Sequence, residues 1–325
     1  MSASRWPTVV YHPSQHPEAL RAQLKTALER REIPAKFHYL TNQQARRWLE
    51  LHDAYSPSRR DDEATSMYQR GFDAVAGDWA ASKIQLIGVG CGGGQKDASL
   101  AASLVRSGAT LSYVACDASP ALVLGAASVM QSSHPAVPVE RLVADLMEAP
   151  DLDDFWGADQ RVFSCLGIVP NVVPGRLVAT LVSWMRPGDR LVLSANLFVP
   201  EKVSHDLASI LSQYDNELTR TWLSTLLDDV GLESSSAAMK FSPEVSSAHG
   251  QPARLVAELP FRDDAEIRFD GRLVRFRRGE KLSLFYSNRF TVDGFEGLLD
   301  DYRLKVLDRH VLDSGEEGVW VCTLD

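Results

Sequence analysis

The 325-residue sequence has few cysteines, few closely spaced histidines and no long hydrophobic run, and each of these features argues against a class of protein. The four cysteines show neither CxxC nor histidine-paired spacing, so we expect neither a disulfide framework nor a zinc site. Among the eight histidines only His12 and His16 have HxxxH spacing, and the prolines at 13 and 17 keep this pair from sharing one face of a helix, which argues against a metal centre. No window approaches transmembrane length and no secretory signal precedes the first helix, so we expect a cytoplasmic protein that does not enter membranes.

The sequence also lacks an excess of positive charge, because 34 Lys and Arg are outnumbered by 43 Asp and Glu and the formal net charge is −9. Binding to a phosphate backbone relies on a basic excess that this composition lacks. The one basic stretch, "GRLVRFRR" at residues 271–278, alternates with apolar residues and predicts a solvated strand face. We therefore expect a small-molecule partner rather than nucleic acid, and a monomer or weak dimer.

Glycine is concentrated in one place, in "IGVGCGGGQKDASL" at residues 87–100, directly after the apolar run "KIQLI". A strand that ends in glycines and continues into a helix presents bare backbone N–H groups to a ligand. The positive end of the helix dipole faces the same ligand. The segment therefore predicts a small-molecule site.

The order of elements predicts the fold class. Helices are expected at 17–33, 42–54 and 62–81, followed by strands that alternate with helices from Ile84 to "DRLVLSANL". Helices are then expected at 202–213 and 217–231, and strands at 252–259, 265–269 and 272–277. The chain is expected to end with a helix capped by Thr291 and a hairpin around "DSGEEG". Strands alternating with helices predict a parallel sheet with helices on both faces. A terminal antiparallel hairpin is typical of the class I S-adenosylmethionine (SAM) methyltransferase sheet.

We therefore predict an α/β protein with a class I SAM-methyltransferase Rossmann-like sheet, a terminal antiparallel hairpin and an inserted α+β substrate-binding domain. The expected divisions are an N-terminal helical segment at 1–81 that contributes to the substrate pocket, a SAM-binding domain at 82–197, an inserted substrate-recognition domain at 198–289, and a C-terminal helix and hairpin at 290–325 that complete the sheet.

Three consecutive strand ends supply the candidate cofactor site. The glycine-rich loop follows the first, Asp117 ends the second and Asp145 ends the third. A carboxylate at Asp117 accepts hydrogen bonds from both ribose hydroxyls in dinucleotide-type sites, and Asp145 would face the adenine. The simpler alternatives are a helix cap and a turn residue, and NAD uses the same glycine and acid pattern. The predicted cofactor-binding residues are Gly88, Gly90, Gly92, Gly93, Lys96, Asp117, Ala118, Asp145 and Leu146.

From about residue 34 to 325 the sequence resembles the histidine-specific Nα-methyltransferase family, SAM-dependent enzymes of ergothioneine formation. "IPAKFHYL" and "HDAYSPS" are similar to its "PKYFY" and "YYPTR" segments, "GVGCGGGQKD" to "ELGSGxxxKT", "YVACDASPALV" to "PVDVSPEAL", "FSCLGIVPNVVP" to "FLGxxIGNxxP" and "MRPGDRLVLSANL" to "LxPGDxLLLGxDL". The resemblance implies that Tyr39 and Tyr55 lie at the amino-acid pocket, that Asn171 binds the substrate amine, and that Tyr214 binds its carboxylate.

The sequence departs from this family where the family recognises imidazole. The family's Glu-x-Ser aligns with Phe285, Tyr286 and Ser287, a pocket methionine with Ala257, and the aspartate of "GxDL" with Asn196. A phenylalanine ring cannot accept a hydrogen bond from a ring N–H. A site that loses a polar partner loses discrimination for the polar substrate. We therefore expect a free amino acid or related small amine other than histidine.

The chemistry expected is methyl transfer from SAM, with Tyr39 or Tyr55 orienting the amine or relaying its proton. S-methylation of a thioether such as methionine needs no base and stays open, as does methylation of a specialised metabolite. Each candidate also has a plainer role: packing for Tyr39, a turn for Asn171, a helix end for Tyr214 and a strand position for Ser287. A catalytically inactive SAM-fold scaffold and an NAD-dependent oxidoreductase are the alternatives from other classes.

Overall fold

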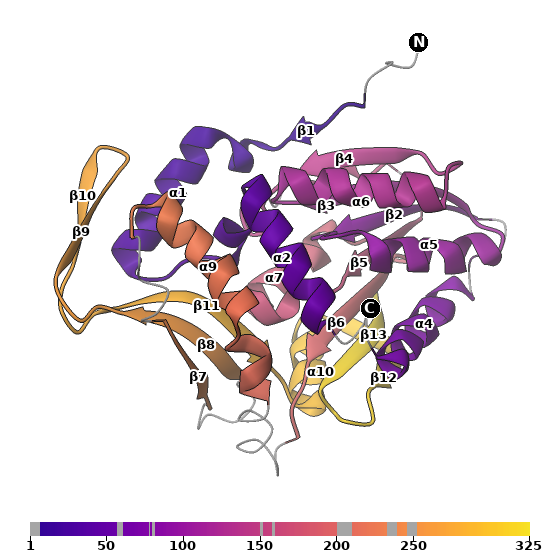
Figure 1. The fold of residues 1–325 in the computed structure, drawn as a ribbon. Helices are drawn as coiled ribbons and strands as arrows, with labels where there is room; N and C mark the ends of the chain where they lie inside the picture. The colour runs from indigo at the N-terminus through magenta and orange to yellow at the C-terminus, as the bar shows by residue number, and fades with distance from the viewer. Residues whose placement is uncertain are drawn as a thin grey trace.

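An eight-stranded sheet forms the centre of the protein (Figure 1). The computed structural model describes residues 7–56, 61–77, 79, 82–149, 152–157, 160–199, 210–232, 239–245 and 252–325. The strand order of the sheet is β1-β4-β3-β2-β5-β6-β13-β12. The strands are β1 (Val10–Tyr11), β2 (Lys83–Val89), β3 (Thr110–Asp117), β4 (Val139–Val143), β5 (Arg161–Cys165), β6 (Arg190–Asn196), β12 (Leu304–Val311) and β13 (Glu317–Leu324). Neighbours from β1 to β6 are parallel, whereas β13 runs antiparallel between β6 and β12. The predicted fold class, with its reversed terminal hairpin, is confirmed.

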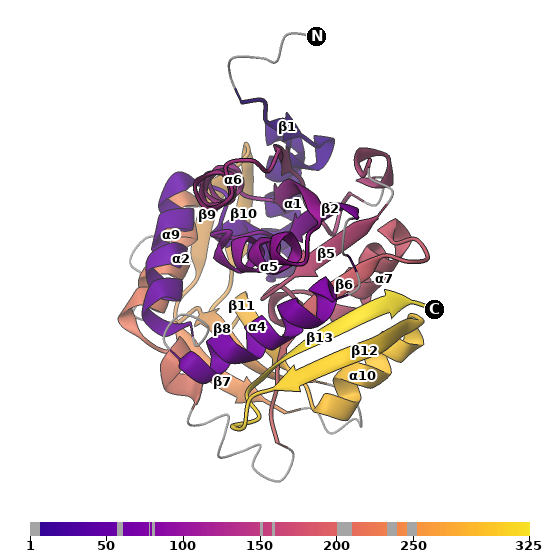
Figure 2. The ribbon, with the colours of Figure 1, turned by 90° about the vertical axis from the view of Figure 1, so that its right-hand side faces the viewer.

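Helices cover both faces of this sheet, as Figure 2 shows from the side. One face packs against α4 (Asp62–Ala76), α5 (Gln95–Arg106) and α6 (Pro120–Ser133), and the other against α7 (Pro174–Trp184) and α10 (Val292–Asp301). Along β2, Ile84 and Leu86 face the first group while Ile87 and Val89 face the second. A parallel strand covered on both sides is apolar throughout, which explains the run before the glycines.

Polar side chains cap the N-termini of several described helices. The Thr41 hydroxyl accepts a hydrogen bond from the Gln44 amide in a capping box that begins α2 (Asn42–Tyr55). The Ser119 hydroxyl caps α6, and the Thr291 hydroxyl caps α10 as predicted. Each cap satisfies an amide that has no partner within its helix.

A second lobe lies beside the carboxyl ends of the parallel strands and has its own apolar core. It contains α9 (Glu217–Asp229), the antiparallel sheet β11-β8-β7 with β7 (Lys240–Glu244), β8 (Ala253–Pro260) and β11 (Lys281–Arg289), and a projecting hairpin of β9 (Ala265–Phe269) and β10 (Arg272–Phe276). The N-terminal α1 (Pro17–Arg30) and η2 (Ala35–His38) share this core, where Leu28 and Phe37 pack with Trp222 and Leu284. The short helices η1 (Pro13–Gln15), η3 (Leu152–Phe155) and η4 (Val169–Asn171) complete the described elements.

Some boundaries differ from the prediction. The helix predicted at 17–33 ends at Arg30 and the one predicted at 62–81 ends at Ala76. Strands β7 and β11 were not predicted, because Pro243 interrupts the apolar pattern of β7 and burial on both faces removes the alternation in β11. Of the helix predicted at 202–213, residues 202–209 lie outside the described residues, and 210–214 are helical. Within the described part of the chain, no helix combines the length and apolar character that a membrane crossing requires.

Candidate functional site

A cavity of about 980 Å³ opens where the parallel strands end, between the central sheet and the second lobe. One wall is formed by residues at or just after the carboxyl ends of β2, β3, β4, β5 and β6. The opposite wall contains side chains of α2, α9 and β11, including Trp48, Trp222 and Phe285. We call the side on the sheet, where the predicted cofactor-binding residues lie, the cofactor half. The second half, lined by the lobe and containing predicted substrate-binding residues, is called the substrate half.

The glycine-rich loop forms the floor of the cofactor half. Gly90, Gly92 and Gly94 have φ values of +62°, +51° and +79°, a region that side chains other than glycine rarely adopt. A Cβ on Gly94 would lie 2.6 Å from the Ala126 Cα, so this residue also allows α5 and α6 to approach. Gly94 is the N-cap of α5, and the loop presents bare backbone to the cavity at the positive end of that helix.

Gly88 has a different position from the other predicted glycines, because it lies within β2 and does not line the cavity. A Cβ there would lie 2.1 Å from Asp97 Oδ2. The Asp97 carboxylate accepts hydrogen bonds from the Tyr113 hydroxyl at 2.6 Å and the Ser164 hydroxyl at 2.5 Å. Burial raises the pKa of Asp97 to about 6. Gly88 thus makes room for a buried carboxylate beneath the loop.

Asp117 lies at the end of β3 and is 9% exposed. Its Oδ2 accepts a hydrogen bond from the Gly92 amide at 3.2 Å, and its Oδ1 accepts one from the Ser119 amide at 2.9 Å. Burial raises the pKa of Asp117 to about 6, although these amides act in the opposite direction. Because Ser119 supplies the cap of α6, Asp117 is not the cap residue that the simpler interpretation suggested.

Asp145 forms an ion pair with Lys36, a residue that the sequence analysis did not single out. The Asp145 Oδ1 also accepts a hydrogen bond from the Met147 amide at 2.9 Å. The Lys36 ammonium group also donates to Gln23. The ion pair connects η2 of the second lobe to the end of β4, and all four of these residues line the cavity.

Lys96 belongs to a polar group at another side of the cofactor half. Its ammonium donates to the Tyr68 hydroxyl at 2.7 Å, and that hydroxyl donates to the Glu317 carboxylate. Glu317 comes from β13, so the terminal hairpin contributes to the cavity. Ala118 and Leu146 line the cavity beside the strand ends.

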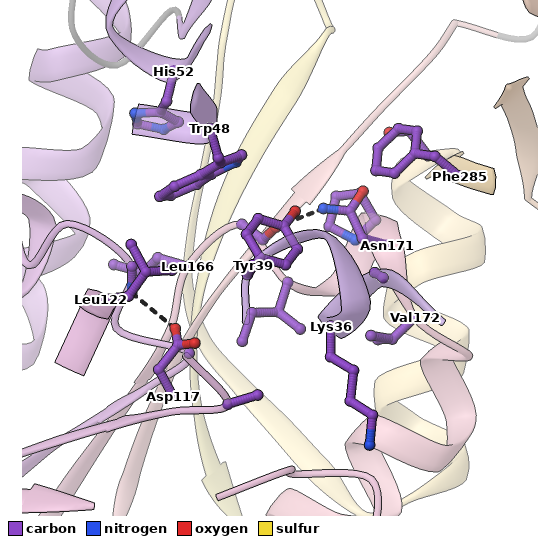
Figure 3. A pocket seen from close by; sticks show the side chains of 18 of the residues that line it. Lys36, Tyr39, Trp48, His52, Asp117, Leu122, Leu166, Asn171, Val172 and Phe285 are labelled. Atoms are coloured by element: carbon purple, nitrogen blue, oxygen red, sulfur yellow. Dashed lines mark hydrogen bonds between the residues drawn. The ribbon is translucent and has the colours of Figure 1, made fainter. Parts of the chain in front are cut away.

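Aromatic rings dominate the second half of the cavity, shown in Figure 3. The ring centroid of Tyr39 lies 5.5 Å from that of Trp48 and 5.3 Å from that of Trp222. The Phe285 ring lies 5.6 Å from Trp222 and 6.3 Å from Tyr214. Burial, together with the Asp117 charge, raises the pKa of Tyr39 well above its ordinary value, so its hydroxyl is neutral at physiological pH. That hydroxyl has no hydrogen-bond partner among the described residues.

One polar cluster interrupts the aromatic wall. The Tyr214 and Ser287 hydroxyl oxygens lie 3.0 Å apart, and the Asn196 side-chain amide donates to them at 3.4 Å and 3.2 Å respectively. Tyr214 and Ser287 are predicted substrate residues, and Asn196 was noted only as a departure from the family. The three side chains come from separate segments and meet at the cavity wall.

The remaining predicted residues have distinct positions. Asn171 lines the cavity from η4, and its side-chain amide donates to the Gly167 carbonyl at 3.5 Å. Tyr55 lies at the rim with 42% of its surface exposed. Ala257 does not line the cavity but pairs directly with Phe285 across β8 and β11. Its small side chain leaves space beside that ring, because directly paired residues lie on the same face of a sheet.

The lining residues that the sequence analysis missed include Lys36, Trp48, Trp222 and Arg289. The sequence could have indicated Lys36, since it belongs to the "IPAKFHYL" segment that identified Tyr39. The two tryptophans come from α2 and α9, whose helical patterns predict only that each has a buried face. Nothing in the sequence indicates that these two faces meet.

Comparison with known proteins places the chain in a family. Residues 21–323 match the family described as "Histidine-specific methyltransferase, SAM-dependent". Among curated proteins, a sequence search finds no match to this chain.

Several solved methyltransferase structures are distantly similar. Magnesium protoporphyrin IX methyltransferase from Synechocystis PCC 6803, solved with S-adenosylhomocysteine (SAH), has 12% identity and a TM-score of 0.43 over 87% of this chain and 95% of that chain. Mitomycin 7-O-methyltransferase has 16% identity and a TM-score of 0.40 over 96% of this chain and 70% of that chain. An amino pentose methyltransferase from Micromonospora echinaspora, solved with SAM, has 15% identity and a TM-score of 0.38 over 81% and 91%. Scores at this level carry no inference about substrate.

The family match covers both halves of the cavity, including the glycine-rich loop and the polar cluster. The chain therefore belongs to the histidine-specific, SAM-dependent methyltransferase family: it is a methyltransferase, and its cofactor is SAM.

Proposed function

We propose that this methyltransferase methylates the amine of a free amino acid or related small amine, and that its substrate is not histidine. The observation that supports this best is the polar cluster of Asn196, Tyr214 and Ser287 beside the ring of Phe285. The cluster offers hydrogen bonds to a small polar group, while the ring offers none to an imidazole. Both line the cavity that contains the glycine-rich loop and Asp117.

The cofactor half fits SAM. Its loop has glycines where a Cβ would fill the space, and Asp117 is a buried acceptor at the end of β3. We assign the ribose hydroxyls to Asp117, the adenine side to Asp145 and Leu146, and the amino-acid end to the glycine loop and Lys96. When bound, SAM supplies an electrophilic methyl group. The chain's own contribution is to hold the nucleophile in line with it, which accounts for much of the rate in such transfers.

Tyr39 is assigned the role of orienting the amine. In the view of Figure 3 it lies between Asp117 on one side and Asn171 and Phe285 on the other. Because its raised pKa keeps the hydroxyl protonated, Tyr39 offers a neutral hydrogen-bonding group and not a phenolate base. On this assignment Tyr39 does not take the proton of the amine. Tyr55 is exposed at the rim, a position suited to substrate entry.

The neutral state of Tyr39 also favours a second candidate, S-methylation of a thioether amino acid such as methionine. A thioether carries no proton to remove before attack, so it needs no base. Aromatic rings around the site suit a sulfur nucleophile, since contacts between sulfur and aromatic rings are favourable. The atom methylated separates the two candidates.

We also propose that different segments of the chain bind the cofactor and the substrate. Residues 82–197 and 290–325 would hold the cofactor, while 1–81 and 198–289 would select the substrate. The core shared by α1, η2 and the inserted strands supports this division. One segment departs from it, because α4 packs on the central sheet.

The test is to incubate the purified protein with SAM carrying a deuterated methyl group and the pooled proteinogenic amino acids. Mass spectrometry then identifies labelled products, and fragmentation locates the methyl on nitrogen or sulfur. Label on the nitrogen of an amino acid other than histidine is the expected result. Label on a sulfur would establish the second candidate, and label on histidine would contradict the exclusion. A pool without any labelled product, alongside measurable SAH binding, would indicate a specialised metabolite.

A further inference from the structure

Arg289 is a charged residue buried against the cavity, and neither the cofactor nor the substrate assignment above includes it. It is 4% exposed and comes near the end of β11. Phe285, Ser287 and Arg289 alternate along this strand and all line the cavity. An aromatic ring, a hydroxyl and a guanidinium therefore follow one another along a single strand face.

The guanidinium is only partly satisfied by the protein. Its Nη1 donates to the backbone carbonyls of Leu197 at 3.0 Å and Glu316 at 3.4 Å. Its Nε is buried without an acceptor, and Nη2 has none either, within the part of the chain that the structure describes. No acidic side chain among those residues, which omit 200–209, forms an ion pair with it.

Another buried arginine shows what full compensation looks like in this protein. Arg161 has a 1% exposed side chain and donates from Nε and Nη2 to Asp189 Oδ2 at 3.0 Å and 2.6 Å. Removing a charge from water costs much free energy unless an opposite charge and hydrogen bonds replace the water. Arg289 is buried in the same way, but no opposite charge among the described residues replaces the water that its guanidinium loses. A ligand anion in the cavity would supply the missing charge.

The surroundings favour an oxyanion at this position. Arg289 donates to the carbonyl of Leu197, the residue after Asn196, and it follows Ser287 on the same face of β11, so it neighbours two members of the polar cluster along the chain. The acidic groups nearby are Glu316 and Glu317, and the Glu317 carboxylate already accepts from Tyr68. Guanidinium groups bind carboxylates with strong, directional hydrogen bonds.

We propose that Arg289 is the countercharge for a ligand carboxylate, and that the substrate supplies it, with the cluster of Asn196, Tyr214 and Ser287 contacting the same group. This rests on the proposed function, because a free amino acid brings a carboxylate into the cavity. SAM also carries a carboxylate, so the two sources must be separated by experiment.

The experiment compares wild type with Arg289→Met and Arg289→Lys by calorimetric titration. In the cofactor arm, SAH is compared with 5′-methylthioadenosine, which lacks the carboxylate. In the substrate arm, SAH-saturated protein is titrated with arylalkanoates of increasing chain length and with their carboxamides. These probes suit the aromatic wall and need no turnover, so the result does not depend on which compound is methylated.

We expect wild type to bind the best acid at least about tenfold more tightly than its amide, and Arg289→Met to lose that preference. Arg289→Lys should retain part of it, which separates loss of charge from loss of fold. If the preference for SAH over 5′-methylthioadenosine collapses instead, the carboxylate is that of SAM. Equal binding of acids and amides by wild type, or preferences unchanged in Arg289→Met in both arms, would overturn the proposal and leave Arg289 a structural role.

Discussion

The two halves of the cavity are built by different means. In the cofactor half, a single segment after β2 supplies a glycine loop, and one carboxylate follows on the next strand. In the substrate half, Tyr39, Trp48, Trp222 and Phe285 come from four separate elements. The first half depends on backbone conformation and the second on side-chain identity. Substitutions in the two halves should therefore fail in different ways.

The largest effect is expected from Gly94→Ala. The new Cβ would lie 2.6 Å from the Ala126 Cα in a residue with φ of +79°, so strain and overlap both destabilise the fold. We expect the free energy of unfolding to fall by about 2 to 4 kcal/mol. Gly125→Ala on the exposed face of α6, with nothing within 4 Å, is the matched control and should gain about 0.5 to 1 kcal/mol. Equal melting temperatures for the two variants would contradict the role of the loop.

Asp117→Asn should weaken SAH binding by about tenfold to a hundredfold near neutral pH, without a comparable loss of stability. The wild-type affinity should also fall as the pH drops through 6, because burial raises the pKa of Asp117 to about 6 and the protonated form is a poorer acceptor. In contrast, the apo protein gains stability from this group as the pH falls, since the folded state binds the proton more tightly. Calorimetry between pH 5 and 8 measures the first effect. A pH profile that Asp117→Asn leaves unchanged would assign the titration to another group, such as Asp97.

Ala257→Met tests whether the substrate half acts through side-chain volume. The residue is 1% exposed and pairs with Phe285, so a larger side chain should displace that ring at a cost of about 1 to 3 kcal/mol. We expect kcat/KM for the methylated substrate to fall about tenfold while the SAH affinity stays within twofold. Ala265→Met, where the residue pairs with Phe276 on the projecting hairpin, is the control. A parallel loss of SAH affinity would show that the two halves are not separable.

The smallest effect is expected from Tyr39→Phe. Its hydroxyl has no hydrogen-bond partner among the described residues, so the melting temperature should stay nearly constant. Loss of one neutral hydrogen bond to substrate predicts a decrease in kcat/KM of about two- to tenfold with an unchanged pH profile. Tyr302→Phe, where the half-buried residue packs against the core on the other face of the sheet, is the matched control. A decrease of several thousandfold, or a shifted pH profile, would instead assign proton acceptance to Tyr39.

Apart from Gly88, the residues that the sequence predicts for the cofactor all line the cavity, because the signals that indicate them are local. Glycines after a strand, an acid at the next strand end and a terminal hairpin each depend on a few neighbouring residues. Most of the substrate half is non-local. Ser287 meets Tyr214 and Asn196 only after three distant segments fold together, and β11 loses its alternating pattern because both of its faces are buried. The family resemblance located some of these residues, but not Lys36, Trp222 or Arg289.

The position of β13 has a consequence for how the protein folds. It inserts between β6 and β12 and contributes Glu317 to the cavity, although it lies far along the chain from β6. Pairing of such distant segments is slow, because the intervening loop must close before the contacts stabilise it. During synthesis the edge of β6 stays unpaired until this late strand emerges from the ribosome. Completion of the sheet and of the cavity is therefore a single late event, and a nascent chain that lacks β13 exposes a strand edge open to aggregation.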